Sequence, residues 1–245
     1  MLYCILFLIL SSLWIPPDSS TLRIAVASNF APTLQEIALQ FTQETGYPVI
    51  LIPGSTGKLY AQIQHHAPFD AFFAADTLHP YLLETHHRTV PGTRFTYARG
   101  VLVLWSPEAI ETPAGAQMLT HPKVQRIALA NPRFAPYGIA AREVLQRLNL
   151  WNRLKARLIM GQNISQVFHF VYSRNASVGF IARAFLHRLP PHQQGTWWEI
   201  PDSLYAPLWQ QAVLLKDSLA GRLFFQFVQQ KHIQQFIRNQ GYYLP

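Results

Sequence analysis

The chain has 245 residues, of which 49% are hydrophobic and 13% charged. This composition excludes a disordered chain and suffices for one large domain or two small ones with buried cores. Twenty Lys and Arg against twelve Asp and Glu give a formal net charge of +8, but the basic residues are dispersed. No recognition-helix or zinc-finger pattern is present, so we predict no nucleic-acid partner. A basic surface can instead attract an anionic ligand.

The first fifteen residues are almost wholly apolar, and Pro16, Pro17 and Asp18 follow them. The run is shorter than the roughly 20 residues of a membrane-spanning helix and is typical of the apolar core of a secretory signal. We therefore predict a leader over residues 1–20 and a periplasmic or other extracytoplasmic location. No Lys or Arg precedes the run and no clean cleavage site follows it, so an uncleaved anchor or a misassigned start is the alternative. The single cysteine, Cys4, lies in this segment and leaves no disulfide in the remaining chain.

Strands and helices alternate along the first part of the chain. The helix predicted over 31–45 carries Leu34, Ile37 and Phe41 on one face, and Gly46 is placed to end it. Short apolar runs predict strands, and the segments between them predict helices, at these positions: strands 22–27, 49–52 and 70–74, and helices 58–65 and 76–83. This alternation predicts a parallel sheet flanked by helices.

The second part repeats the alternation. The predicted elements are strands at 100–105, 127–130 and 178–182, helices at 139–148 and 163–174, a return strand within 206–215, and a helical segment at 221–240. We predict an α/β protein of two lobes joined by a hinge, each a mostly parallel sheet flanked by helices. The predicted divisions are a leader at 1–20, the first part of lobe I at 21–97, lobe II at 98–204, and a return to lobe I at 205–245.

Four predicted loops share one design, in which a strand ends, small or polar residues follow, and a helix begins. Their residues are Ser28 and Asn29, Ser55 and Thr56, Tyr137 and Gly138, and Asn163, Ile164 and Ser165. In open α/β sheets, ligands bind beyond the carboxyl ends of the strands. Helix N-termini leave backbone N–H groups free and carry partial positive charge, so several together can hold an anion. The alternative for any single loop is that its Ser, Thr or Asn only caps a helix.

At these loops the sequence resembles the periplasmic molybdate-binding proteins of ABC importers, which have the type II periplasmic-binding fold. The most specific match is the stretch from Gly54 to Ile63 (GSTGKLYAQI) with APFDAFFAAD at 67–76 behind it. The other matching stretches are AVASNF at 25–30, ANPRFAPYG at 130–138, GQNISQ at 161–166 and VGF at 178–180. The matches are collinear from about residue 22 to the end of the chain.

The resemblance implies a role for each matched residue. Ser28 matches a hydroxyl ligand of the first loop, and Asn29 adds a backbone amide. Ser55 matches the second-loop serine, which gives hydroxyl and amide contacts. Tyr137 matches a tyrosine whose phenol donates to the anion in some members, and Ile164 matches a position that donates its backbone N–H.

Two positions depart from the family pattern. Thr56 stands where a serine is common in the family, and this replacement keeps the hydroxyl but adds a methyl group. Other members take a tyrosine from the strand at 178–182, where this chain has Ala182, so Tyr137 is left to supply the missing hydroxyl.

The resemblance implies a binding protein, not an enzyme, that captures molybdate or tungstate and passes it to the membrane subunits of an ABC permease. It also implies a monomer that uses no cofactor and no metal other than the oxyanion itself. A site made of donors suits an oxyanion that is fully deprotonated and can only accept hydrogen bonds. Sulfate, phosphate or an organic acid is the alternative ligand, and an enzyme on the same fold is the alternative class.

Overall fold

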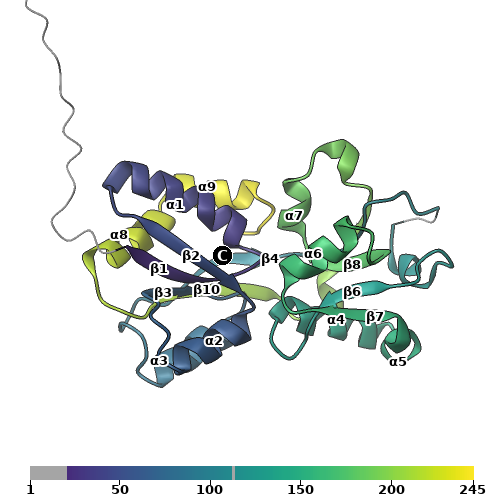
Figure 1. Cartoon of the computed structure of the whole chain (residues 1–245), viewed down its shortest axis with the longest axis horizontal. Coiled ribbons are helices and arrows are strands. Elements are labelled where there is room, and N and C mark those ends of the chain that lie inside the picture. Colours follow the sequence, from purple (N-terminus) through teal and green to yellow (C-terminus); the bar gives the residue numbers. More distant parts are fainter. Residues whose placement is uncertain (1–20, 112–113) are drawn as a thin grey trace, which may run out of the picture.

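The computed structural model describes residues 21–111 and 114–245 and contains two five-stranded sheets. The predicted leader, residues 1–20, lies outside the described residues. Figure 1 shows the two sheets side by side, each covered by helices on both faces. This is the predicted two-lobed α/β architecture. We call the first sheet with its helices lobe I and the second sheet with its helices lobe II.

The sheet of lobe I has the strand order β2-β1-β3-β10-β4. The strands are β1 (Leu22–Ala27), β2 (Val49–Gly54), β3 (Ala71–Phe73), β4 (Phe95–Gly100) and β10 (Leu208–Leu214). β1 runs parallel to β2 and β3, whereas β10 is antiparallel to β3 and β4. Four strands therefore point one way, and the returning β10 lies between β3 and β4.

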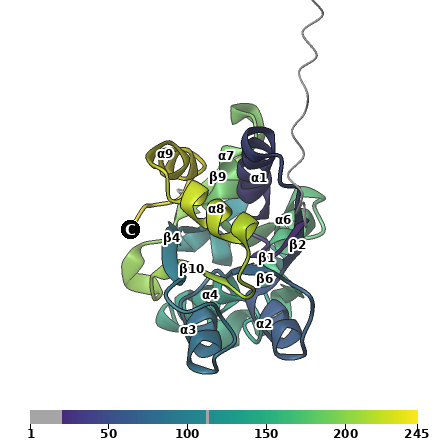
Figure 2. The same ribbon diagram turned by 90° about the vertical axis from the view of Figure 1, so that its left-hand side faces the viewer.

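The helices of lobe I form two layers, which Figure 2 shows end-on. They are α1 (Ala31–Thr45), α8 (Leu219–Val228) and α9 (Lys231–Asn239) on one face, and α2 (Thr56–Gln64) and α3 (Leu78–Thr85) on the other. Phe41 of α1 meets Phe224 of α8 edge-on, with ring centroids 5.0 Å apart, in the core of the first face. α1 ends where predicted, because Gly46 adopts a left-handed conformation that other residues disfavour.

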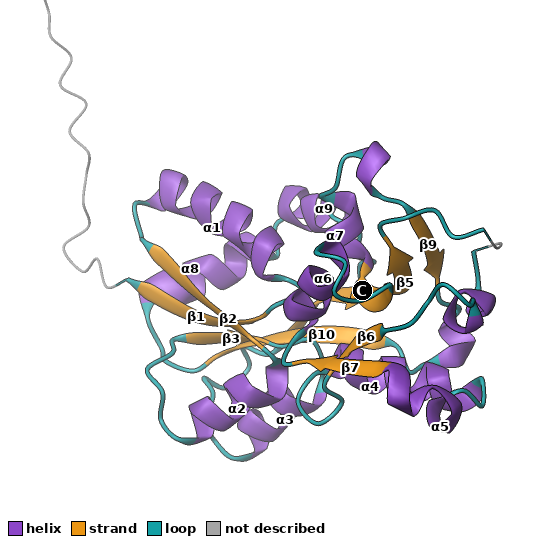
Figure 3. Ribbon diagram, turned by 45° about the vertical axis from the view of Figure 1, so that its right-hand side comes forward, coloured by secondary structure: helices purple, strands orange, loops and turns teal. Residues whose placement is uncertain are grey.

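Lobe II repeats this plan with the strand order β7-β6-β8-β5-β9. The strands are β5 (Leu102–Ser106), β6 (Ile127–Ala130), β7 (Leu158–Gly161), β8 (Val178–Ala182) and β9 (Thr196–Glu199). The helices are α4 (Pro136–Arg147), α5 (Trp151–Leu154), α6 (Ile164–Tyr172) and α7 (Arg183–His187). Figure 3 shows α6 and α4 on opposite sides of this sheet. β6 is parallel to β7 and β8, and β5 is antiparallel to β8 and β9.

Several predicted boundaries were wrong. The strand expected at 100–105 is β5, which begins at Leu102 in lobe II, whereas Gly100 ends β4, a strand of lobe I that was not predicted. The helix expected from residue 139 begins at Pro136, since proline suits the first turn of a helix. The segment expected to be mostly helical at 221–240 does hold two helices, α8 and α9. The short elements β7, β9 and α5 were not predicted.

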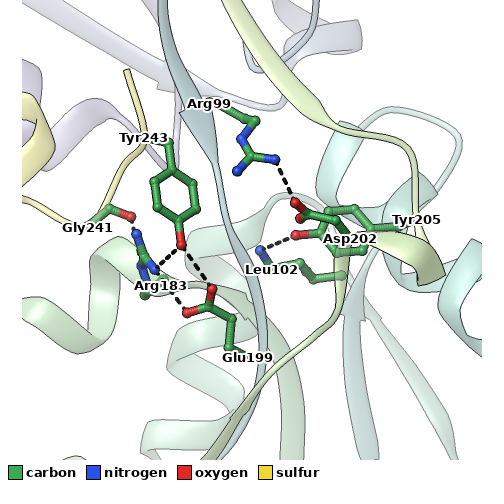
Figure 4. Close-up of polar contacts among 8 residues, drawn as sticks. All are labelled: Arg99, Leu102, Arg183, Glu199, Asp202, Tyr205, Gly241 and Tyr243. Atoms are coloured by element: carbon green, nitrogen blue, oxygen red, sulfur yellow. Dashed lines mark hydrogen bonds and ion pairs between the residues drawn. The ribbon is translucent and has the colours of Figure 1, made fainter. Parts of the chain in front are cut away.

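The chain crosses between the lobes beside a cluster of polar contacts (Figure 4). The Arg183 guanidinium, at the start of α7, donates to Gly241 O (3.1 Å) and to Glu199 Oε2 (2.9 Å). The Tyr243 backbone pairs with Arg99 of β4, with N···O distances of 2.7 and 3.0 Å. The Tyr243 ring lies between the guanidinium groups of Arg99 and Arg183, each 4.6 Å from its centroid. The C-terminal segment therefore ties lobe I to lobe II near the crossing.

Within the described residues, no helix combines the length and apolarity that a bilayer-crossing helix requires.

Candidate functional site

The six residues predicted to contact the ligand line a single cavity between the lobes. Lobe I contributes four of them and lobe II two: Ser28, Asn29, Ser55 and Thr56, and Tyr137 and Ile164. All six are buried, with exposed fractions of 4% or less. Among the described residues that line this cavity, none carries a charge.

The first loop follows β1 and is held by its neighbours on both lobes. The Ser28 N–H donates to Gly54 O at 2.9 Å, which fixes the β1 loop against the end of β2. Ser28 O accepts from the Ser165 hydroxyl of lobe II at 3.2 Å. Ser28 precedes the N-cap residue of α1, Phe30, so it does not cap that helix.

Ser55 occupies the N-cap position of α2, but its hydroxyl makes no capping bond. Its Oγ is fully buried without a hydrogen-bond partner. A buried hydroxyl without a partner costs about 1–3 kcal/mol, so most such groups are paired. The simple capping role that the sequence left open for Ser55 is therefore not what the structure shows. Its hydroxyl remains available to a ligand in the cavity.

Thr56 begins α2, and its Oγ1 accepts the Ala75 N–H at 3.0 Å. Because the oxygen accepts this bond, the hydroxyl hydrogen is left to point elsewhere. The backbone N–H of Thr56 lies in the first turn of the helix, where no intrahelical acceptor exists. Thr56 thus offers two donors at the edge of the cavity.

Tyr137 lies in the first turn of α4, not in a loop before the helix as the sequence suggested. Burial raises the pKa of its phenol well above the ordinary value, and the nearby Tyr242 and Tyr205 hydroxyls raise it further. The phenol is therefore neutral and keeps a hydrogen to donate. Its oxygen lies 3.4 Å from the Gln210 amide nitrogen of β10.

Ile164 is the first residue of α6. Asn163 caps this helix by accepting the Gln166 N–H on its side-chain oxygen at 2.9 Å. The capping role suggested for the fourth loop is thus correct for Asn163. The N–H of Ile164 stays free of intrahelical partners and lies at the positive end of the helix dipole.

Ala182 does not line the cavity. It ends β8, where it is fully buried and pairs with Leu102 of β5. This chain therefore presents no side-chain donor from that strand, whereas Tyr137 reaches the cavity from α4.

Contacts between the lobes close the cavity. The Gly57 N–H donates to Phe134 O at 2.8 Å, and the Lys58 ammonium donates to Gln162 Oε1 at 2.8 Å. The remaining cavity has a volume of about 10 Å³, enough for about one water. A solute larger than water can therefore enter this cavity only if the lobes separate.

A larger hollow of about 280 Å³ lies elsewhere in lobe II, lined in part by Ser106, His121 and Arg174. The Arg174 guanidinium in its wall already pairs with Glu108 at 2.9 Å. Residues from helix starts in both lobes converge on the small cavity, which makes it the candidate site.

Two lobes of similar topology that close on a buried cavity lined by uncharged donors define a protein that captures a small solute. A model of the bacterial extracellular solute-binding protein family matches residues 22–243, so the chain belongs to this family.

Two sequence relatives and one solved structure show which members of this family the chain resembles. The chain is 38% identical to the molybdate-binding protein ModA of Azotobacter vinelandii over 92% of its own length and 90% of the relative's. It is 37% identical to the corresponding protein of Rhodobacter capsulatus, over 93% of this chain and 90% of that one. The structure of the Azotobacter vinelandii periplasmic molybdate-binding protein superposes with a TM-score of 0.87 at 35% identity, covering 91% of this chain and 99% of that one. These findings confirm the resemblance seen in the sequence.

Proposed function

We propose that this protein captures molybdate or tungstate and delivers it to the membrane subunits of an ABC importer. The observation that carries the proposal is the buried Ser55 hydroxyl, which has no partner within the closed cavity. Because an oxyanion supplies acceptors, a ligand of this class satisfies that hydroxyl. The similarity to two molybdate-binding proteins supports the choice of ion.

The donors proposed for the ligand are the hydroxyls of Ser28, Ser55, Thr56 and Tyr137 and the backbone N–H groups of Asn29 and Ile164. Hydrogen bonds to an ionised acceptor are about twice as strong as neutral ones, and the surrounding protein strengthens them further. An Asp or Glu in the lining would favour a protonated anion, but the described lining residues include neither. The donor set therefore favours a fully deprotonated oxyanion.

The deciding experiment is calorimetric titration of the purified chain with molybdate, tungstate, sulfate and phosphate. We expect heat and a raised melting temperature with molybdate or tungstate. No response to either ion contradicts the proposal. Tighter binding of sulfate or phosphate would keep the solute-binding class but replace the ligand.

The remaining parts of the proposal concern the context of binding. We propose that the protein is exported by residues 1–20, acts as a monomer, and releases its ligand unchanged. Cell fractionation with N-terminal sequencing tests export, and light scattering tests the monomer. Recovery of chemically altered ligand after incubation would instead favour an enzyme.

A further inference from the structure

A buried polar network lies directly behind the cavity, centred on Gln210 of β10. Gln210 is fully buried, at a position where the pairing of β10 with β4 shifts register. Its Oε1 accepts from Asn29 Nδ2 at 2.9 Å and lies 2.9 Å from the Tyr97 hydroxyl, whose single hydrogen is shared with the Ala74 carbonyl oxygen at 3.0 Å. Its Nε2 faces the Tyr137 oxygen at 3.4 Å. Gln210 thus joins one cavity residue of lobe I to one of lobe II.

The orientation of the Gln210 amide follows from its contact with Asn29, because the Tyr97 hydroxyl can direct its one hydrogen either to Ala74 O or to Gln210 and so does not fix the amide. The backbone carbonyl of Asn29 can only accept, so the Tyr242 hydroxyl must donate its hydrogen to it, at 2.8 Å. Tyr242 can then only accept from the Asn29 side chain, at 3.4 Å, which places Nδ2 on that side. Nδ2 in turn faces Gln210, so the Gln210 atom beside it must be the acceptor Oε1. The other end of the amide, the donor Nε2, is left facing Tyr137.

This orientation has a consequence for the Tyr137 hydroxyl. A phenol has one hydrogen to donate. When its oxygen accepts from Gln210 Nε2, that hydrogen cannot point at Gln210 and is free to point into the cavity. If the Gln210 amide were reversed, its oxygen would take the phenol hydrogen and leave only lone pairs for the ligand.

Gly100 provides the space for this contact. It is the last residue of β4, at the crossing between the lobes, and a Cβ atom there would overlap both the Tyr137 oxygen and Gln210 Nε2. The close approach therefore requires glycine at this position. The crossing backbone, the amide and the phenol form one packed unit beside the cavity.

We propose that Gln210 is a positioning residue that directs the Tyr137 hydroxyl, so that the phenol hydrogen is available to the ligand. The inference rests on the proposed function, because the direction of the phenol hydrogen matters only when an anion occupies the cavity. Gln210 itself does not contact the ligand. This role makes Gln210 a determinant of affinity for oxyanions, since a reversed amide would take the phenol hydrogen away from the ligand.

A double-mutant cycle on molybdate affinity tests the proposal. We expect Tyr137→Phe to raise Kd by about 10- to 100-fold, as for the loss of a bond to a charged ligand. Gln210→Met should raise it by about 5-fold or more, because the phenol hydrogen is no longer directed. In the Tyr137→Phe background, Gln210→Met should add less than about 2-fold, because the two residues act through one hydrogen bond.

The matched control is Gln211→Met. Gln211 is the next residue of the same strand and also makes two side-chain hydrogen bonds, to Arg94 and Thr96, but neither of these partners lines the cavity. We expect its replacement to leave Kd within about 2-fold of the unmodified protein. A purely structural role for Gln210 predicts additive losses in the cycle, and that outcome overturns the proposal.

A second cycle covers the case in which Gln210→Met does not fold. Gly100→Ala leaves the Gln210 amide intact but pushes a methyl group into its contact with the phenol. Its effect on Kd should be large alone and small in the Tyr137→Phe background, whereas equal effects in both backgrounds contradict the inference. If the unmodified protein binds neither molybdate nor tungstate, both the proposed function and the role of Gln210 are contradicted. If it binds either ion but one of the cycles is additive, only the role of Gln210 is contradicted.

Discussion

Replacing Ser55 by alanine should change stability and affinity in opposite directions. In the unliganded protein the Ser55 Oγ is buried without a partner, so its removal abolishes a desolvation cost and should stabilise the fold by about 1 kcal/mol. For a chain of this length, that corresponds to a rise in melting temperature of about 2–4 °C. With molybdate bound, the same change removes a hydrogen bond to a charged group, worth about 1.5–3 kcal/mol. Kd should therefore rise by about 10- to 150-fold.

Calorimetry of thermal unfolding without ligand and isothermal titration with molybdate measure the two effects separately. Ser106→Ala is a suitable control, because Ser106 is equally buried but its Oγ accepts the Glu108 N–H at 3.3 Å, away from the cavity. The control should lose stability and keep its affinity. A Ser55→Ala protein that is less stable without ligand, or that binds molybdate as tightly as before, would refute the reasoning.

Three further outcomes are expected. Lys58→Met removes the exposed bond to Gln162 across the cavity mouth, so affinity should fall by at most about 1 kcal/mol and ligand should dissociate faster in stopped-flow measurements. Tyr243→Leu removes a ring held between two guanidinium groups, and scanning calorimetry of the unliganded protein should show a lower melting temperature, for a loss of about 1–2 kcal/mol. Burial raises the phenol pKa of Tyr97 and Tyr137, so the stability that depends on their neutral form is complete below pH 10 and is lost as the pH rises above it. The free energy of unfolding, measured with denaturant, should therefore fall steeply above pH 10, and less steeply in Tyr137→Phe.

Much of the fold could be predicted because local patterns decide it. The apolar face of α1 and the glycine after it lie within sixteen consecutive residues, and both were found where expected. A change of lobe was predicted between residues 97 and 98, but the residue at which the chain leaves β4 for β5 could not be read from the sequence, because the two strands are one residue apart although they belong to different sheets. The pairing partner of a strand is a long-range property, and no local pattern records it.

The candidate site also has a part that local patterns predict and a part that depends on long-range contacts. Six of the residues that line the cavity could be named from the sequence, because each lies in or just before the first turn of a helix, in a short recognisable stretch. Gln210 was missed, since its partners Asn29 and Tyr137 are 181 and 73 residues away in sequence. A signal did exist, namely two consecutive polar residues within the otherwise apolar strand β10. Such a pair indicates polar contacts made from within the strand, but it does not identify the residues that are contacted.

The net charge of +8 and the uncharged cavity have different consequences for the ligand. Surface charges attract any anion, and salt screens them over about 8 Å at physiological ionic strength. They therefore cannot distinguish molybdate from sulfate, because both carry two negative charges. Discrimination must come from the spacing and direction of donors in the cavity, which favours rigid groups held from behind. The Tyr137 phenol, fixed by burial and by its contact with Gln210, meets that requirement, whereas a flexible lysine would follow an anion of either size.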